Sequence, residues 1–222
     1  MRFHGIGRIV PSWKSVVMHE VSSHRLLAVL TRNPAPGRVK TRLASTVGTE
    51  TALHVYRTLR EYTAGVIKKC HTEKAVFYSD DIPAHDCFLG GGTLAFLQDG
   101  HDFGARMHHT FTTGFSLDFR RVVLIGTDCP EIDTCIIETA FTELENHDAV
   151  LGPARDGGFY LIGLKQERPE LFRDRTWSHA LVLHETIDIL DRNGASYFLL
   201  PELQDIDTFE DLKQSRLWPI KA

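Results

Sequence analysis

The sequence lacks both long hydrophobic runs and an excess of basic residues. Its longest apolar segments, such as LLAVL at Leu26–Leu30, are far shorter than the roughly 20 residues that cross a bilayer as a helix. Lys and Arg number 25 against 29 Asp and Glu, which gives a net charge of −4. A general nucleic-acid-binding protein usually carries a clear basic excess. We therefore expect no membrane span and no nucleic-acid partner, although a local basic site stays open.

Cysteine is also scarce, and no two cysteines form a CxxC pair. The four cysteines are Cys70, Cys87, Cys129 and Cys135. A chain of 222 residues can bury a substantial core without disulfide bonds. Free structural thiols are therefore expected, rather than a metal site or a catalytic cysteine.

The first 24 residues contain neither a continuous apolar segment nor a strand or helix periodicity. Because the apolar segment of a signal peptide is missing, a cytoplasmic location is expected. Residues 1–24 are expected to form a loose extension. Met18 is an alternative start of the native chain, since the first convincing strand begins near Arg25.

From Arg25 onward, strand patterns alternate with helical ones. Expected strands are at residues 25–31, 74–79, 94–98, 121–126, 148–154, 158–164 and 196–201, and expected helices at 49–70, 104–115, 135–144, 179–192 and 209–215. Continuous apolar strands that alternate with helices indicate a mainly parallel sheet covered on both faces. The sequence therefore predicts one three-layer α/β/α domain. In such sheets ligands bind outside the carboxyl ends of the strands, so the residues after each strand are the candidates for a site.

Four cations follow the first strand: Arg32, Arg38, Lys40 and Arg42. Pro36 and Gly37 stiffen and turn the backbone here, so that these charges could converge. Phosphate oxygens accept hydrogen bonds from both Arg and Lys, which favours anion binding over a solvated basic loop. The Gly-rich spacing of a P-loop is absent.

Asp128 stands at the end of the apolar strand in VVLIGTDCPEID, between Gly126 and Pro130. It could cap the following helix, but Asp133 is better placed to do so. Asp128 is therefore free for another role. A carboxylate at a strand end beside a phosphate-type loop suits Mg²⁺ or Mn²⁺, which prefer oxygen ligands.

Two further strand exits carry acids. Asp156, Gly157 and Gly158 form either a plain hairpin turn or a close backbone approach to a ligand, and the sequence leaves both open. Asp205 and Asp207 stand two apart after the last strand, where Thr208 and Asp211 fit a capping box. One of the two acids could simply support that helix start, and the alternative is a second metal carboxylate that partners Asp128.

The segment QDGHDFGARMHH offers Arg106 and three histidines. Arg106, early in a helix, could reach an anionic group. The histidines are His101, His108 and His109. Adjacent histidines point to different faces of a helix, so a zinc site is not expected.

Six motifs occur in order: NPAPGRVKTRL, QDGHDFGARM, LIGTDCP, GPARDGGFYLIGL, WS and LPELQDIDTFEDL. Together they resemble the GT-A-type nucleotide-diphospho-sugar transferase superfamily, and within it the rSAM/selenodomain-associated transferase family, whose members are often called glycosyltransferase-like. The likeness runs from Arg25 to Leu212. Relatives with defined chemistry include the molybdenum-cofactor and phospholactate guanylyltransferases. The resemblance implies a GT-A-like transferase domain over residues 25–222.

By the pattern of that family, the Lys40–Arg42 loop would hold nucleotide phosphates, Asp128 would carry the metal, and Asp207 would be a second ligand. Asp156, Gly157 and Gly158 would line the acceptor side. The candidate nucleotide-binding residues are then Arg32, Pro36, Gly37, Lys40, Arg42 and Arg106, and the candidate acceptor-binding residues are Asp156, Gly157, Gly158 and Trp177. Two positions depart from the family: Arg32 stands where Lys is common and keeps the charge, and His179 follows Trp177-Ser178 where Thr is common. The acceptor contacts there need not follow the family's pattern.

The expected function is a transferase that uses Mg²⁺ or Mn²⁺ and a nucleotide-activated donor. Asp128, Lys40 and Asp156 are the expected catalytic residues, Asp156 as a base. Glycosyl transfer from a nucleotide-diphospho-sugar to a small acceptor stands slightly ahead of nucleotidyl transfer, which the basic loop favours. A nucleotide-binding module without catalysis is a third alternative. The presence of both Asp128 and Asp207 argues against it, because binding alone would not need both acids. The expected partners are a nucleotide or nucleotide-sugar and a small acceptor, and the oligomeric state, including a homodimer, stays open.

Overall fold

The computed structural model describes residues 24–219. The expected extension before Arg25, apart from His24, and the alternative start at Met18 lie outside the described residues. Seven strands form one sheet in the order β3-β2-β1-β4-β6-β5-β7. They are β1 (Arg25–Thr31), β2 (Glu73–Tyr78), β3 (Leu94–Leu97), β4 (Arg121–Ile125), β5 (Ala149–Pro153), β6 (Phe159–Leu164) and β7 (Tyr197–Leu199).

The helices are α1 (Thr41–Val47), α2 (Thr49–Ile67), α3 (Phe103–Ser116), α4 (Thr134–Glu143), α5 (Val182–Arg192) and α6 (Phe209–Gln214), with a short 3₁₀ helix, η2 (Pro169–Leu171). Within the described part of the chain, none of them is long and apolar enough to cross a membrane. Each of the four cysteines is a free thiol.

The sheet is parallel except for one strand. β1 pairs in parallel with β2 and β4, β2 with β3, and β5 with β7, whereas β6 runs antiparallel to both β4 and β5. The carboxyl ends of the six parallel strands therefore meet at one edge, where β6 begins. The chain moves from β1 to β2 and β3 on one side and then crosses to β4 on the other. In open α/β sheets such a reversal opens a crevice for ligands, here between the ends of β1 and β4.

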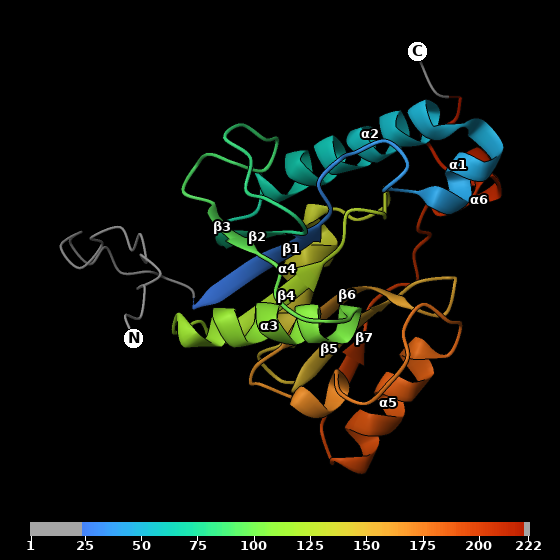
Figure 1. Ribbon diagram of the computed structural model, residues 1–222. Coiled ribbons are helices and arrows are strands. Elements are labelled where there is room, and N and C mark those ends of the chain that lie inside the picture. Colours follow the sequence, from blue (N-terminus) through green and yellow to red (C-terminus); the bar gives the residue numbers. More distant parts are fainter. Residues whose placement is uncertain (1–23, 220–222) are drawn as a thin grey trace, which may run out of the picture.

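Two apolar layers cover the two faces of the sheet. On one face, Leu27 and Val29 of β1 pack with residues of α2 and α4, such as Ile67 and Phe141. Side chains alternate along a strand, so Leu26 and Ala28 point to the other face and pack with α3 and α5. Figure 1 shows α2 above the sheet and α3 and α5 below it. The predicted three-layer α/β/α domain is confirmed.

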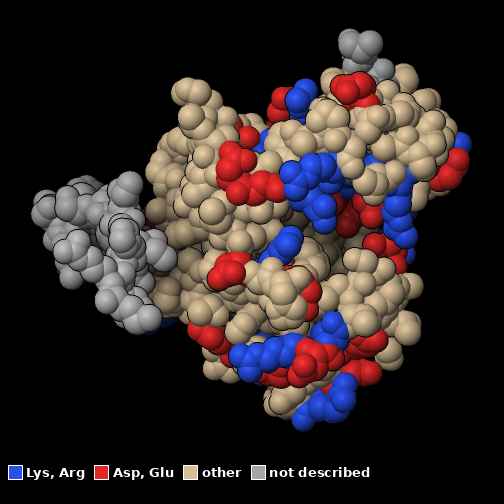
Figure 2. All heavy atoms as spheres, in the orientation of Figure 1, with Lys and Arg blue, Asp and Glu red and all other residues tan. Residues whose placement is uncertain are grey.

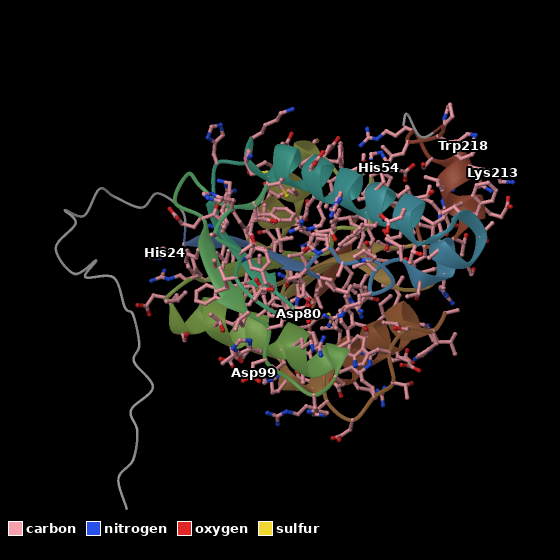
Figure 3. The ribbon with its side chains drawn as sticks, turned by 45° about the horizontal axis from the view of Figure 1, so that its top comes forward. His24, His54, Asp80, Asp99, Lys213 and Trp218 are labelled. Carbon is pink, nitrogen blue, oxygen red and sulfur yellow. The ribbon has the colours of Figure 1, made fainter. Side chains whose placement is uncertain are left out.

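A third apolar cluster joins the helices α1 and α2, which follow the first strand, to α6, the last helix. Leu43 of α1, Ala52 and Leu59 of α2, and Ile206 and Leu212 near α6 are buried together. Beside it, Phe209 packs edge-on against Trp218 at 5.5 Å between ring centroids, with Lys213 above its ring. Figure 3 labels Lys213 and Trp218 at this corner of the molecule. The cluster holds the segment after β7 against the loop after β1.

Several expected boundaries were wrong: the helix expected at 49–70 ends at Ile67, and two other differences have a clear cause. Residues 41–47, expected to be loop, form α1, because Leu43 finds apolar partners on α2 and α6 that are distant in sequence. The helix expected at 179–192 begins only at Val182, since the ring of His179 accepts a hydrogen bond from the amide of Leu181 and holds a local turn there. Its end at Asn193-Gly194 was correct, with Gly194 at φ +62°.

Candidate functional site

A cleft of about 610 Å³ lies at the carboxyl edge of the sheet. This volume is within the usual range for a small-molecule site. Figure 2 shows the hollow between the part of the molecule that carries α2 and the part that carries α3 and α5, with blue and red atoms gathered along it. The charged residues that line it are Arg32, Arg38, Lys40, Arg42, Arg106, Asp128, Asp156, Asp205 and Asp207.

Lys40 lies between two aspartates at the centre of this site. Its Nζ is 2.8 Å from Oδ1 of Asp128 and donates a hydrogen bond of 2.9 Å to Oδ1 of Asp207. The Lys40 side chain is only 4% exposed, whereas those of Asp128 and Asp207 are 44% and 42% exposed. The ammonium is therefore buried beneath two carboxylates that remain open to the cleft.

The charges of this cluster shift one another's pKa. Burial alone would lower the pKa of Lys40, but the two carboxylates outweigh it and raise that pKa above its ordinary value. Burial likewise would raise the pKa of Asp207, and the positive charges of Lys40 and Arg42 together lower it below its usual range. At neutral pH Lys40 is therefore positively charged and Asp207 negatively charged.

A backbone hydrogen bond brings the last loop to Asp128. The amide of Ile206 donates to the carbonyl of Asp128 at 3.0 Å, and Ile206 is fully buried. Its neighbours Asp205 and Asp207 are thereby held beside Asp128. Neither acid caps α6, because Thr208 and Asp211 form the complete capping box. The predicted capping by Asp133 is also confirmed, with its side chain accepting from the amide of Ile136.

Two buried carboxylate oxygens in the cleft have no hydrogen bond: Oδ1 of Asp128, whose contact with Lys40 is an ion pair without hydrogen-bond alignment, and Oδ1 of Asp205. Burial raises the pKa of Asp205 to about 7, and the charge of Asp128 acts in the same direction. Such oxygens are suitable ligands for a hard divalent cation. Among residues 24–219, however, no group of three or more His, Cys, Asp or Glu side chains is placed to hold a metal ion.

Tyr56 of α2 fixes the start of the basic loop. Its hydroxyl accepts from the amide of Arg32 at 2.9 Å and donates to the Arg32 carbonyl at 3.1 Å. It also lies 3.3 Å from Oγ1 of Thr31 and 3.5 Å from Oγ1 of Thr127. One hydroxyl thus ties the loop after β1 to the loop that carries Asp128.

The four cations of the basic loop all border the cleft but differ in their partners. Arg38 pairs with Asp80 at 2.6 Å, and Figure 3 labels Asp80. Arg42, on the first turn of α1, is 72% exposed and lies 3.8 Å from Oδ2 of Asp207. Arg32 makes one long hydrogen bond of 3.4 Å to the carbonyl of Arg38. Two of these guanidinium groups, Arg32 and Arg42, are therefore only weakly held by the protein.

Arg106 reaches the cleft from the first turn of α3. Its Nε donates to the carbonyl of Gly100 at 3.3 Å, and it makes no ion pair within the described part of the chain. The preceding Asp102 caps the helix, as its side chain accepts from the amide of Ala105 at 2.7 Å. The charge of Arg106 is thus available to an anionic ligand.

The Asp156 segment is a hairpin turn and also borders the cleft. It joins the antiparallel strands β5 and β6, and Asp156 Oδ1 accepts from the amide of Gly158 at 2.9 Å. Gly157, at φ +88°, is required by a protein contact, since a Cβ there would lie 2.0 Å from the carbonyl oxygen of Ala180. Gly157, Pro36 and Gly37 do not line the cleft.

Three aromatic side chains also line the cleft. The ring of Trp177 meets Phe103 edge-on at 5.8 Å and Phe159 at 6.5 Å between centroids, and all three line the cleft. Arg175 stacks over Trp177 at 4.6 Å and holds the segment before α5 with hydrogen bonds to Thr186 and Glu185. The cations of the loop after β1 are called here the basic half of the cleft and these three aromatic residues its aromatic half, and the aspartates line the same cleft.

Sequence reasoning missed several polar residues of the cleft. Gln98 donates to the carbonyls of Thr31 and Phe77 at 2.8 and 2.9 Å, and so joins the ends of β1 and β2. Its place at the end of the strand expected at residues 94–98 was a usable signal. Tyr56 and Thr127 carried no such signal. Tyr56 falls on the apolar stripe of a helix and is explained there as a core residue.

Comparison with known proteins places the chain in a family and a superfamily. The sequence matches the family DUF2064, described as "Uncharacterized protein conserved in bacteria", over residues 63–179. A proposed nucleotide-diphospho-sugar transferase of Desulfovibrio desulfuricans has a similar structure, with a TM-score of 0.81 and 30% identity over 90% of each chain. No curated protein sequence matches the chain.

More distant structures share the fold alone. A 4-diphosphocytidyl-2C-methyl-D-erythritol synthase of Anaerococcus prevotii has a TM-score of 0.58 at 7% identity, over 90% of this chain and 100% of its own. A cytidylyltransferase of Leptospira borgpetersenii has a TM-score of 0.54 at 15% identity, over 86% and 84%. The predicted superfamily is confirmed by the Desulfovibrio desulfuricans structure at 30% identity, while the narrower rSAM/selenodomain-associated family stays a prediction.

Proposed function

This chain belongs to the DUF2064 family, and we propose that it is a metal-dependent transferase that uses a nucleotide-activated donor. The observation that supports this most directly is the cluster of Lys40, Asp128 and Asp207 in a cleft of about 610 Å³ at the sheet's reversal point. The related protein of Desulfovibrio desulfuricans, a proposed nucleotide-diphospho-sugar transferase, supports the same reaction class.

Asp128 and Asp207 would hold Mg²⁺ or Mn²⁺. Their half-exposed carboxylates and the unbonded buried oxygen of Asp128 suit a hard cation, which prefers oxygen ligands. When held there by Asp128 and Asp207, such a cation would offset the charge that develops on the departing group.

The basic half of the cleft binds the donor phosphates. Lys40 and Arg42 stabilise the negative charge of the departing group, and Arg32 and Arg106 orient the donor from either side. Arg42, Arg32 and Arg106 are suited to this because none of them is engaged in a tight ion pair with the protein. Pro36 and Gly37 shape the loop without lining the cleft.

The acceptor binds in the aromatic half. Trp177 offers a flat apolar surface there, and Asp156 and Gly158 border the same space. Asp156 acts as the base that takes the acceptor's proton, since within residues 24–219 its carboxylate accepts one hydrogen bond, from the amide of Gly158, and keeps oxygen lone pairs for a substrate. Gly157 supports this turn through its contact with Ala180.

Glycosyl transfer from a nucleotide-diphospho-sugar to a small acceptor is the reaction that we propose first. Nucleotidyl transfer from a nucleoside triphosphate is the second candidate, because four cations along one loop provide more charge than a diphosphate requires. The two differ in the bond that breaks: glycosyl transfer releases a nucleoside diphosphate, and nucleotidyl transfer releases pyrophosphate.

Calorimetric screening followed by product analysis tests the proposal. The protein is titrated with UDP-, GDP- and CDP-sugars and with the common nucleoside triphosphates, with and without Mg²⁺ or Mn²⁺. The donors that bind are then incubated with a mixture of sugars and sugar phosphates. Release of a nucleoside diphosphate supports glycosyl transfer. Release of pyrophosphate contradicts glycosyl transfer and supports nucleotidyl transfer instead. Binding without turnover would favour the non-catalytic nucleotide-binding module, and no binding at all would contradict all three.

A further inference from the structure

The position of Lys40 raises a question about how a cation enters the site. The ammonium lies at the point shared by the two carboxylates, 2.8 Å from Asp128 and 2.9 Å from Asp207. A divalent cation that bridges the same two side chains must come close to this ammonium or take its place. Like charges at such separations repel strongly in a buried setting.

In the ion pairs that Lys40 and Arg42 form with Asp128 and Asp207, positive and negative charges are equal in number. A balanced cluster attracts a further cation weakly, whereas the two aspartates alone would attract it strongly. The affinity for a divalent cation therefore depends on where the Lys40 side chain points.

The backbone of Lys40 adopts a sparsely populated conformation. Lys40 has φ +48° and ψ +45°, in the left-handed region that residues other than glycine rarely adopt. Strained residues cluster at functional sites, where their surroundings hold them in place. Here the only polar partners of the ammonium within residues 24–219 are the two aspartates.

We propose that Lys40 is the resting counter-cation of Asp128 and Asp207, and that these aspartates bind a divalent cation only together with a phosphate-bearing ligand. The ligand's phosphate oxygens draw the Lys40 ammonium away from the carboxylates and leave both free to bind the cation. Binding is thus concerted, and the protein without a donor holds no divalent cation. The inference rests on the proposed function, because it assigns the cleft to a phosphate-bearing donor.

The wild-type protein provides the first test, with Mn²⁺ and inorganic pyrophosphate as probes. A bound ligand raises the unfolding temperature, so thermal unfolding is followed with each probe alone and with both. We expect no shift with Mn²⁺ alone and a shift with both probes that exceeds the sum of the single shifts. A full shift of the unfolding temperature with Mn²⁺ alone would overturn the inference. A shift with both probes that only equals the sum of the two single shifts would overturn it as well.

Two variants provide the second test. In Lys40→Met the side chain keeps its length and loses its charge, and in the matched control Arg42→Met a charge is lost from the same loop without emptying the space between the aspartates. Mn²⁺ binding without phosphate is measured from the electron paramagnetic resonance signal of free Mn²⁺. We expect Lys40→Met to bind Mn²⁺ at least about tenfold more tightly than the wild type, and Arg42→Met to change the affinity by less than about threefold because its side chain is 72% exposed.

Equal Mn²⁺ affinity of the wild type and Lys40→Met would overturn the inference. If Lys40→Met fails to fold, as circular dichroism would reveal, the thermal shifts of the wild type decide the question alone. These measurements involve no turnover, so they separate the two proposals. Tighter Mn²⁺ binding by Lys40→Met without transfer from any donor would contradict only the proposed function. Transfer by a wild type that binds Mn²⁺ as tightly as the variant would contradict only this inference.

Discussion

Lys40 and Asp207, 167 residues apart in the chain, are joined by a hydrogen bond of 2.9 Å at the carboxyl edge of the sheet. The bond brings together the loop after β1 and the segment after β7. The Ile206 amide and the buried cluster of α1, α2 and α6 hold these segments in register. The same contact supplies the charge cluster on which the proposed function and the behaviour of the cation site depend.

Asp128→Asn should lower kcat with the preferred donor by about 10²–10³-fold, because it removes the charge of a proposed metal ligand that stabilises the transition state. The dependence of the rate on Mg²⁺ concentration should weaken at the same time. Steady-state rates across a Mg²⁺ series measure both effects.

Asp133→Asn is the matched control for this variant. Asp133 lies in the same segment but caps α4 through the amide of Ile136, and Asn caps a helix as well as Asp does. Its rate and metal dependence should stay at the wild-type level. An unchanged metal dependence in Asp128→Asn would exclude Asp128 as a ligand.

Asp86→Asn should lower the free energy of unfolding by about 3–5 kcal/mol at pH 7, because it leaves the buried Arg60 charge without its partner. Asp86 Oδ2 accepts from Arg60 at 2.8 Å, and the two side chains are 9% and 5% exposed. Urea unfolding measures the loss. In Asp80→Asn, whose partner Arg38 is 67% exposed, the loss should stay below about 1 kcal/mol.

The effect of Asp86 should also depend on pH. Burial alone would raise the pKa of Asp86, but hydrogen bonds from Arg60, Tyr78 and the Phe88 amide, with the Arg60 charge, lower it below the ordinary value. The ionised group therefore stabilises the fold above its unfolded pKa of about 3.9, and this contribution is lost as the pH falls through the lower folded pKa. The stability difference between wild type and Asp86→Asn should shrink in that range, and a difference that is constant down to pH 2 would contradict the assignment.

Gly157→Ala should destabilise the protein by at least about 2 kcal/mol, since it adds a Cβ at positive φ against the Ala180 carbonyl. Gly91→Ala isolates the effect of the backbone, because Gly91 has φ +59° and open space around its Cβ position. Its cost should be about 1 kcal/mol. Equal midpoints of the two variants in urea unfolding would show that the contact between Gly157 and Ala180 is not tight.

Trp177→Ala should raise the KM for the acceptor by about tenfold and leave the KM for the donor nearly unchanged, because the ring belongs to the aromatic half of the cleft. Trp218→Ala is the control. Trp218 packs on Phe209 beside α6 and does not line the cleft, so neither KM should change. A rise in the donor KM alone would place Trp177 on the nucleotide side instead.

Much of this protein is determined by short stretches of its sequence. Period-2 and period-3.6 apolar patterns predict its strands and long helices, and Asp133, Thr208 and Asp211 mark helix starts because a cap is a hydrogen bond between residues three apart. The same patterns place Asp128 and Asp207 at strand exits. Since parallel strands meet at one edge, the sequence already implied that these acids lie on the same side of the sheet.

Only the tertiary structure decided which side chains from the ends of different strands come into contact. Lys40 is buried between Asp128 and Asp207, and the Tyr56 hydroxyl holds Arg32, through partners far away in the chain. The helix α1, in an expected loop, likewise depends on the distant apolar partners of Leu43. No local pattern encodes these contacts, because each is set by the order of the strands and by which apolar surfaces remain to be covered. Sequence therefore indicated which charged residues reach the site, and packing determined which charges face one another within it.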